Sequence, residues 1–159
     1  MMGVSEFNSA CFYRYANIDL AQLEENLQGD AELARRTVEA FLRVSFEAIP
    51  TGKQNSMAAQ NPPSLVFAVV RKSGFWSLAN AFVRPVSTAS QENLVVKSIE
   101  ALRDHWNRLI KVYGDDGIKL KTCITIEDID LKDLNPSDNL NGLVQQVLTA
   151  ISRNGEAKS

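Results

Sequence analysis

The sequence predicts an α/β fold of the α+β type, in which helices cover a sheet. Three segments have the composition of strands, and three stretches repeat apolar residues at helical spacing. They follow one another in the order β-α-β-α-β-α. With 159 residues, 45% of them hydrophobic, the chain can bury one modest core. We therefore expect a single domain over residues 1–159.

Three segments carry the strand signal. Residues 7–20 hold several β-prone residues between polar ones, which predicts a partly buried first strand. Residues 64–71 form a nearly continuous apolar run, typical of a central strand with neighbours on both sides. Residues 118–126 alternate, which predicts a strand with one solvated face, suited to a sheet edge. The residues predicted on that face are Lys119, Lys121, Cys123 and Thr125.

Three stretches have the periodicity of amphipathic helices. Asp30 is placed to cap a helix that ends at Pro50. Ser90 is predicted to cap a second helix, whose apolar face extends over residues 94–110. The last helix carries a continuous apolar stripe over residues 140–151.

Few residues of the chain are suited to catalysis or to metal binding. The one histidine, His105, has no nucleophile-bearing motif near it, so a surface or packing role is expected. Cys11 and Cys123 are too few and too far apart for a disulfide framework or a zinc motif. The acidic stretch 127–133 lacks the glycine and the last glutamate of a calcium loop, which indicates a solvated connection. No catalytic residue, metal ligand or cofactor is predicted, and a small enzyme is the least supported class.

The chain carries no signal for a membrane. No apolar run approaches the roughly 20 residues of a spanning helix. The first ten residues have neither the basic start nor the apolar stretch of a secretory signal. We therefore expect a cytoplasmic protein with no membrane partner.

Charge is distributed unevenly along the chain. The net charge of -2 argues against a nucleic-acid partner when taken alone. Residues 51–112, however, hold 8 basic and 3 acidic side chains, whereas residues 1–50 hold 4 and 8 and residues 113–159 hold 5 and 8. Only the middle third has a charge that favours a polyanion. Variation of this size also arises by chance on solvated surfaces, so both interpretations stay open.

A polar loop in this middle third is the candidate binding element. Residues 51–63 contain almost no large apolar side chain and end in a proline pair, which predicts an unusually long loop. Gly52 permits close approach of a ligand to the backbone, and Lys53 supplies a positive charge. Further hydrogen-bonding groups come from Gln54, Asn55 and Ser56. Such a loop suits a sugar-phosphate backbone, although an ordinary polar turn has the same composition.

Four segments, taken together, resemble a known family. They are FYRYANIDLAQLEENL at 12–27, GKQNS at 52–56, AAQNPPSLV at 58–66 and SLANAF at 77–82. In this order they closely resemble the CasC-type, or "Cas-seven", backbone subunit of the type I-E CRISPR interference complex, Cascade. The likeness covers most of the chain and corresponds to the second half of that subunit.

The resemblance implies a fold and a function. Members of the family have a palm built on an RNA-recognition-motif-like (ferredoxin-like) sheet, together with fingers and a thumb, and several copies line up along the CRISPR RNA. This chain would be the C-terminal part of the palm, with fingers and thumb absent. The implied function is that of a non-catalytic CRISPR RNA-binding subunit in antiviral defence. Its implied partners are the CRISPR RNA, neighbouring copies, other Cascade subunits and, through the guide, target DNA.

The resemblance also implies which residues contact the RNA. The loop of Gly52, Lys53, Gln54, Asn55 and Ser56 would lie against the RNA backbone. Arg14 is a further expected contact, although a salt bridge within the palm would use the same side chain. A fragment that acts only through contacts with other proteins, without RNA affinity of its own, is the alternative.

Overall fold

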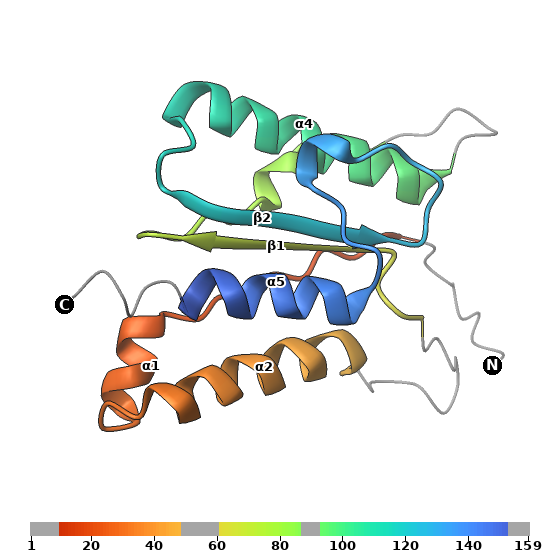
Figure 1. Ribbon diagram of the computed structural model, residues 1–159. Coiled ribbons are helices and arrows are strands. Elements are labelled where there is room, and N and C mark those ends of the chain that lie inside the picture. The colour runs from red at the N-terminus through yellow and green to blue at the C-terminus, as the bar shows by residue number, and fades with distance from the viewer. Residues whose placement is uncertain (1–9, 49–60, 87–92, 153–159) are drawn as a thin grey trace, which may run out of the picture.

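The computed structural model of the protein describes residues 10–48, 61–86 and 93–152. In these ranges an antiparallel sheet lies between layers of helices (Figure 1). The elements are α1 (Leu20–Asn26), α2 (Ala31–Glu47), β1 (Leu65–Arg71), the 3-10 turn η1 (Ala79–Phe82), α4 (Leu94–Tyr113), β2 (Ile118–Thr125), the 3-10 turn η2 (Lys132–Leu134) and α5 (Leu140–Ser152). This α+β class, with helices covering the sheet, confirms the predicted fold class and is in keeping with part of a ferredoxin-like palm.

The sheet, as far as the structure describes it, consists of β1 paired antiparallel with β2. Phe67 lies opposite Cys123 and Val70 lies opposite Leu120. The register shifts at the next pair, where Lys119 is left without a partner in a bulge. Alternate side chains of β1 pack into the two cores on opposite faces of the sheet, which explains the continuous apolar run of this strand.

The core on the α4 face is centred on Trp106, which is 1% exposed. Its ring makes edge contacts with the rings of Phe67 and Trp76, at centroid distances of 5.0 and 5.7 Å. Cys123 and Leu134 are fully buried in the same cluster. This face of the sheet is therefore closed by α4, η1 and the segment around η2.

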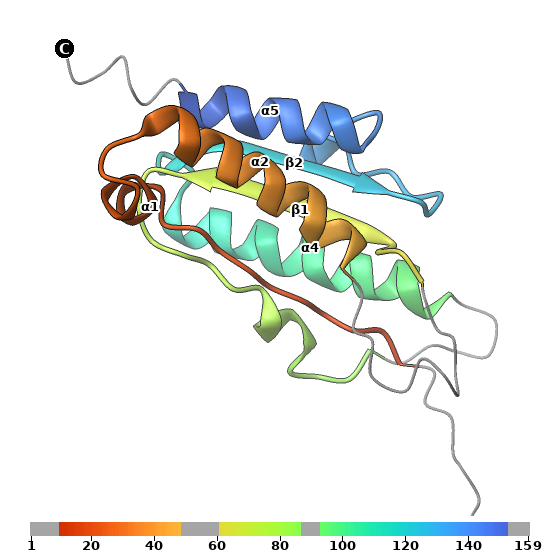
Figure 2. The ribbon, with the colours of Figure 1, turned by 90° about the horizontal axis from the view of Figure 1, so that it is seen from below.

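The other face is covered by α5, and α2 packs beneath α5 as an outer layer (Figures 1 and 2). Leu143 and Val147 pack with Val70 of the sheet, while Val144 and Leu148 pack with Val38 of α2. The helix α5 is thus buried on two sides, against the sheet and against α2, and its apolar surface is correspondingly wide. This agrees with the apolar stripe predicted over residues 140–151.

Of the two predicted helix caps, one is confirmed and the other is a different residue. The Asp30 carboxylate accepts a hydrogen bond from the Leu33 amide at 2.9 Å and caps α2, as predicted. The cap of α4 is Asn93, whose side chain accepts from the Val95 amide at 2.9 Å. Ser90, which the sequence predicts as the cap, lies outside the described ranges. Serine and asparagine cap equally well, and the helix begins immediately after the asparagine.

The strand predicted over residues 7–20 is wrong for residues 10–19, which form no strand. This segment runs along the side of β1 that faces away from β2 (Figure 2). Its side chains act as separate anchors: the Tyr13 hydroxyl accepts from the Leu78 amide at 2.9 Å, and the Tyr13 ring lies 5.6 Å from the Phe82 ring. Phe12 is 89% exposed, which a half-buried strand would not allow. The aromatic residues that suggested a strand are thus used for side-chain contacts.

Two predictions about the second half of the chain also need correction. Cys123 is not on a solvated face, because α4 and η2 cover that side of β2 and leave it 0% exposed. The acidic stretch 127–133 is not simply a solvated connection, because it is anchored in the core by Leu131 and followed by the buried Leu134. Lys119, in contrast, is exposed as predicted.

Burial of Cys123 predicts a decline of stability at alkaline pH. Burial, and then the charge of Asp133, raises the pKa of this thiol to about 11 from an ordinary value of 9.0. Between pH 9 and 11 the thiol ionises in the unfolded chain but not in the folded one, so the free energy of unfolding falls. We expect the wild type to lose about 2–3 kcal/mol over this range relative to Cys123→Ala.

Urea unfolding of both proteins at pH 8 and pH 11 measures this difference. The alanine variant provides the control, because lysine and tyrosine titrations are common to both proteins. A stability difference that does not change with pH would show that the thiol is not held in its neutral form by the fold.

Candidate nucleic-acid interface

The five loop residues predicted to contact RNA lie outside the described ranges. They are Gly52, Lys53, Gln54, Asn55 and Ser56. The connection that contains them joins the end of α2 at Glu47 to the start of β1 at Leu65. Leu65 pairs with Thr125, so the connection meets the sheet at the end where β1 begins and β2 finishes.

Arg14 lies at the base of this connection. Its Nη1 donates a hydrogen bond to the Ala48 carbonyl at 2.7 Å, directly after α2. This carbonyl is one of those that a helix end leaves without an internal partner. A cation there also interacts favourably with the negative end of the helix dipole. Two residues 34 positions apart are thereby brought together. The partner of Arg14 is a carbonyl, and no described carboxylate forms the salt bridge that was the alternative.

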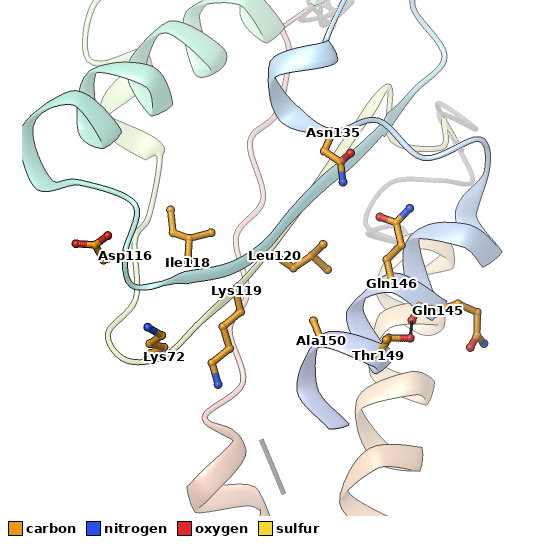
Figure 3. A pocket seen from close by; sticks show the side chains of 10 residues that line it. All are labelled: Lys72, Asp116, Ile118, Lys119, Leu120, Asn135, Gln145, Gln146, Thr149 and Ala150. Atoms are coloured by element: carbon orange, nitrogen blue, oxygen red, sulfur yellow. Dashed lines mark hydrogen bonds between the residues drawn. The ribbon is translucent and has the colours of Figure 1, made fainter. Parts of the chain in front are cut away.

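A groove that the sequence does not reveal lies between β2 and α5 (Figure 3). Its volume is about 670 Å³. Leu120 and Ala150 give it an apolar floor, and Ile118, whose side chain packs in the core with Trp106, lies at its edge. Lys72 and Lys119 lie on one side, and the amide and hydroxyl side chains lie on the other (Figure 3). Those polar residues are Asn135, Gln145, Gln146 and Thr149.

The two lysines of the groove come from the end of β1 and the start of β2: Lys72 directly follows β1, and Lys119 lies in β2. The Lys72 amide donates to the Gly117 carbonyl at 2.8 Å, which fixes the chain after β1 beside the start of β2. Lys119 is the unpaired residue of the bulge, and a bulge changes the direction in which a side chain points. Neither ammonium group has a carboxylate partner among the described residues. The groove therefore has a positively charged side, with Asp116 as its one lining acid.

The acidic residues that suggested a calcium loop are engaged in other contacts. Glu127 accepts a hydrogen bond from Asn93 at 2.9 Å, and Asp133 accepts one from Asn107 at 2.9 Å. The pKa of Asp130 lies below its ordinary value, because the backbone and side chain of Lys132 donate to its carboxylate. Nowhere in the described ranges do three histidine, cysteine or acidic side chains gather as metal ligands would.

Among the helices in the described ranges, none has both the length and the apolar composition that crossing a bilayer requires.

Comparison with known proteins identifies the family. The family model described as "CT1975-like protein" matches residues 1–146. The chain belongs to the CT1975-like family. The matched range includes β1, α4, β2 and the first half of α5, and with them all the lining residues of the groove except Thr149 and Ala150.

Two solved structures are similar to this CT1975-like chain. A chain of a "CRISPR RNA-guided surveillance complex" is 32% identical to it, with a TM-score of 0.75, over 84% of this chain and 50% of that chain. A chain of a "CRISPR RNA-guided surveillance complex, pre-nicking" is 32% identical, with a TM-score of 0.74, over 84% of this chain and 35% of that one. The CT1975-like chain thus spans half, or about a third, of the chains that it matches. No curated protein matches it.

Loss of the Arg14 side chain is expected to loosen the end of α2. Arg14→Ala removes an exposed hydrogen bond to a helix-end carbonyl and should lower the free energy of unfolding by about 0.5–1 kcal/mol. The matched control is Arg36→Ala, because Arg36 is also exposed and has no partner among the described residues. Urea unfolding measures both variants. Equal stabilities of the two would mean that the contact of Arg14 with Ala48 contributes nothing.

Proposed function

We propose that this CT1975-like chain is a CRISPR RNA-binding backbone subunit of the type I-E Cascade complex, acting in antiviral defence. The observation that carries the proposal is the similarity to a chain of a CRISPR RNA-guided surveillance complex, at 32% identity and a TM-score of 0.75. The proposed partners are the CRISPR RNA, neighbouring copies of the subunit and other Cascade subunits. We propose that the chain corresponds to the C-terminal part of the palm of that subunit.

We infer that the subunit is not an enzyme and holds the guide by its backbone. In such complexes base pairing with the guide reads the target DNA, so the protein needs contacts to phosphates and sugars and no reacting groups. The fully buried Cys123 has a raised pKa, so its thiol stays protonated and is not a nucleophile at neutral pH. The loop at 52–56 and the neighbouring Arg14 supply the proposed contacts, and a cytoplasmic location suits them.

The loop contact is tested by binding of single-stranded guide RNA to the chain. Lys53→Ala removes a phosphate contact, so affinity should fall several-fold and the dependence of log K on log salt should become shallower by about 0.7. Gln54→Ala should weaken binding without changing this slope. Lys111→Ala, an equal change of charge on an exposed residue of α4, is the control. Affinities of Lys53→Ala and Gln54→Ala equal to that of the wild type would contradict the loop contact.

A second candidate function, protein interaction alone, is favoured by the free edge of β1. The Cys123 carbonyl accepts from the Ser137 amide at 2.8 Å, so the backbone groups of Cys123 point away from β1. Its antiparallel partner Phe67 must then point its own N–H and C=O away from β2, and so must Val69, two residues on. No backbone hydrogen bond from the described residues reaches this edge.

An edge with unpaired N–H and C=O groups is a template for a further strand, which would displace the segment 10–19 that runs along it. The side chains of β1 are apolar up to Arg71, and both faces of the strand are covered by helices, as is usual for a strand inside a sheet. The similar chains are about two or three times the matched length. A strand from the N-terminal half of such a subunit is the proposed occupant of this edge.

Amide hydrogen exchange tests this edge directly. In the chain alone, the amides of Phe67 and Val69 should exchange much faster than those of Ala68 and Val70, which bond to β2. Adding the separately produced N-terminal half of a Cascade backbone subunit should slow the two fast amides. Uniform protection of all four amides in the chain alone would show that the edge is already occupied. If the wild type fails to bind RNA at low salt but gains this protection, the second candidate holds in place of the first.

A further inference from the structure

We propose that the groove between β2 and α5 binds the sugar-phosphate backbone of single-stranded RNA, as a contact separate from the loop at 52–56. The inference rests on the proposed function, because that function supplies the RNA. It adds a second binding site, where β1 finishes and β2 begins, built from residues that the family resemblance does not assign.

The charge of the groove comes from two lysines that the fold places side by side. Lys72 follows the end of β1 and Lys119 occupies the bulge of β2, so segments almost 50 positions apart meet here. Both side chains are exposed, and neither has a carboxylate partner among the described residues. A lysine ammonium acts on a phosphate as a point charge and needs no fixed orientation. Two adjacent ammonium groups therefore suit neighbouring phosphates of one strand.

The opposite side of the groove supplies neutral hydrogen-bonding groups. Gln145, Gln146 and Thr149 lie within about one turn of α5, so they present amide and hydroxyl groups along the groove. Side chains of these types commonly bond phosphate and sugar oxygens without reading the bases. The groove has no aromatic lining residue on which a base could stack. Its chemistry thus favours the backbone of a nucleic acid and predicts little dependence on sequence.

The amide oxygen of Gln146 favours RNA over DNA as the ligand of the groove. Its Oε1 is buried, and the described residues provide no hydrogen-bond donor for it. An acceptor left in this way destabilises the fold, and a donor from a ligand relieves the cost. If the amide rotates so that this oxygen faces the groove that Gln146 lines, a ribose 2′-hydroxyl can donate to it. Deoxyribose lacks that hydroxyl, so the groove should prefer RNA.

The size and the floor of the groove agree with this ligand. A volume of about 670 Å³ is within the usual range of roughly 300–1,000 Å³ for ligand sites. The apolar floor of Leu120 and Ala150 accommodates the carbon face of a ribose. An acidic peptide would match the charge, but bidentate recognition of carboxylates is characteristic of arginine, and both cations here are lysines.

The test compares three probes by fluorescence anisotropy over 50–300 mM salt: a 12-nucleotide oligo-uridylate, the matching oligo-deoxythymidylate and poly-glutamate. The variant Lys72→Gln/Lys119→Gln should bind the RNA about tenfold more weakly, with a salt slope shallower by about 1.4. The control Arg36→Gln/Arg108→Gln also removes two exposed cations, and its affinity should stay within twofold of the wild type. Gln146→Leu should bring the affinities for RNA and DNA together.

The outcomes separate this inference from the proposed function. If Lys53→Ala weakens RNA binding and the double lysine variant does not, the groove is not a contact although the proposed function stands. If the wild type binds no RNA at 50 mM salt, the proposed function fails, and the groove proposal fails with it. Poly-glutamate that binds the groove at least as tightly as RNA would show a site for an acidic protein instead. Equal affinity of the wild type for RNA and DNA would overturn the role of Gln146.

A second readout does not depend on the variants. Photocrosslinking of the wild type to an oligonucleotide that carries 4-thiouridine should label the peptides containing Lys72 and Lys119. Labels confined to α2 and η1 would place the RNA elsewhere and contradict the proposal.

Discussion

The pairing of β1 with β2 is the constraint on which the rest of the structure depends. It joins two segments that α4 separates in the sequence, and it defines two faces that are covered by different helices. Phe67 and Cys123, opposite each other, direct their side chains into the core with Trp106. On the other face Val70 meets Leu143 of α5. Without this register neither core would close, and Lys72 would not lie beside Lys119.

The parts of the fold that could be predicted from the sequence are those with strong local signals. The apolar run of β1, the Asp30 cap and the stripe of α5 each have one dominant physical cause, so they are found where the sequence places them. The segment 10–19 could not be predicted in this way, because Tyr13 and Arg14 bond to the backbone of Leu78 and Ala48, far along the chain. The burial of Cys123 likewise depends on η2, a turn with no periodic signal.

The two candidate binding sites also differ in how far the sequence alone reveals them. The loop at 52–56 is continuous in sequence, so its composition alone draws attention to it. The groove takes its residues from the ends of two strands, the turn at Asn135 and α5, and only the folded chain brings these together. The groove lies where β1 finishes, whereas the connection that contains residues 52–56 joins β1 at Leu65, the start of a strand of seven residues that spans about 23 Å.

The bulge at Lys119 inserts a residue that the pairing of β1 with β2 does not require. Arg71 pairs with Ile118 and Val70 pairs with Leu120, so a chain that lacked Lys119 would continue the ladder without interruption. Ile118 and Leu120 would still face opposite cores, as they do now. The architecture thus has no need of the inserted residue, and what the insertion adds is extra twist and one cation at the rim of the sheet.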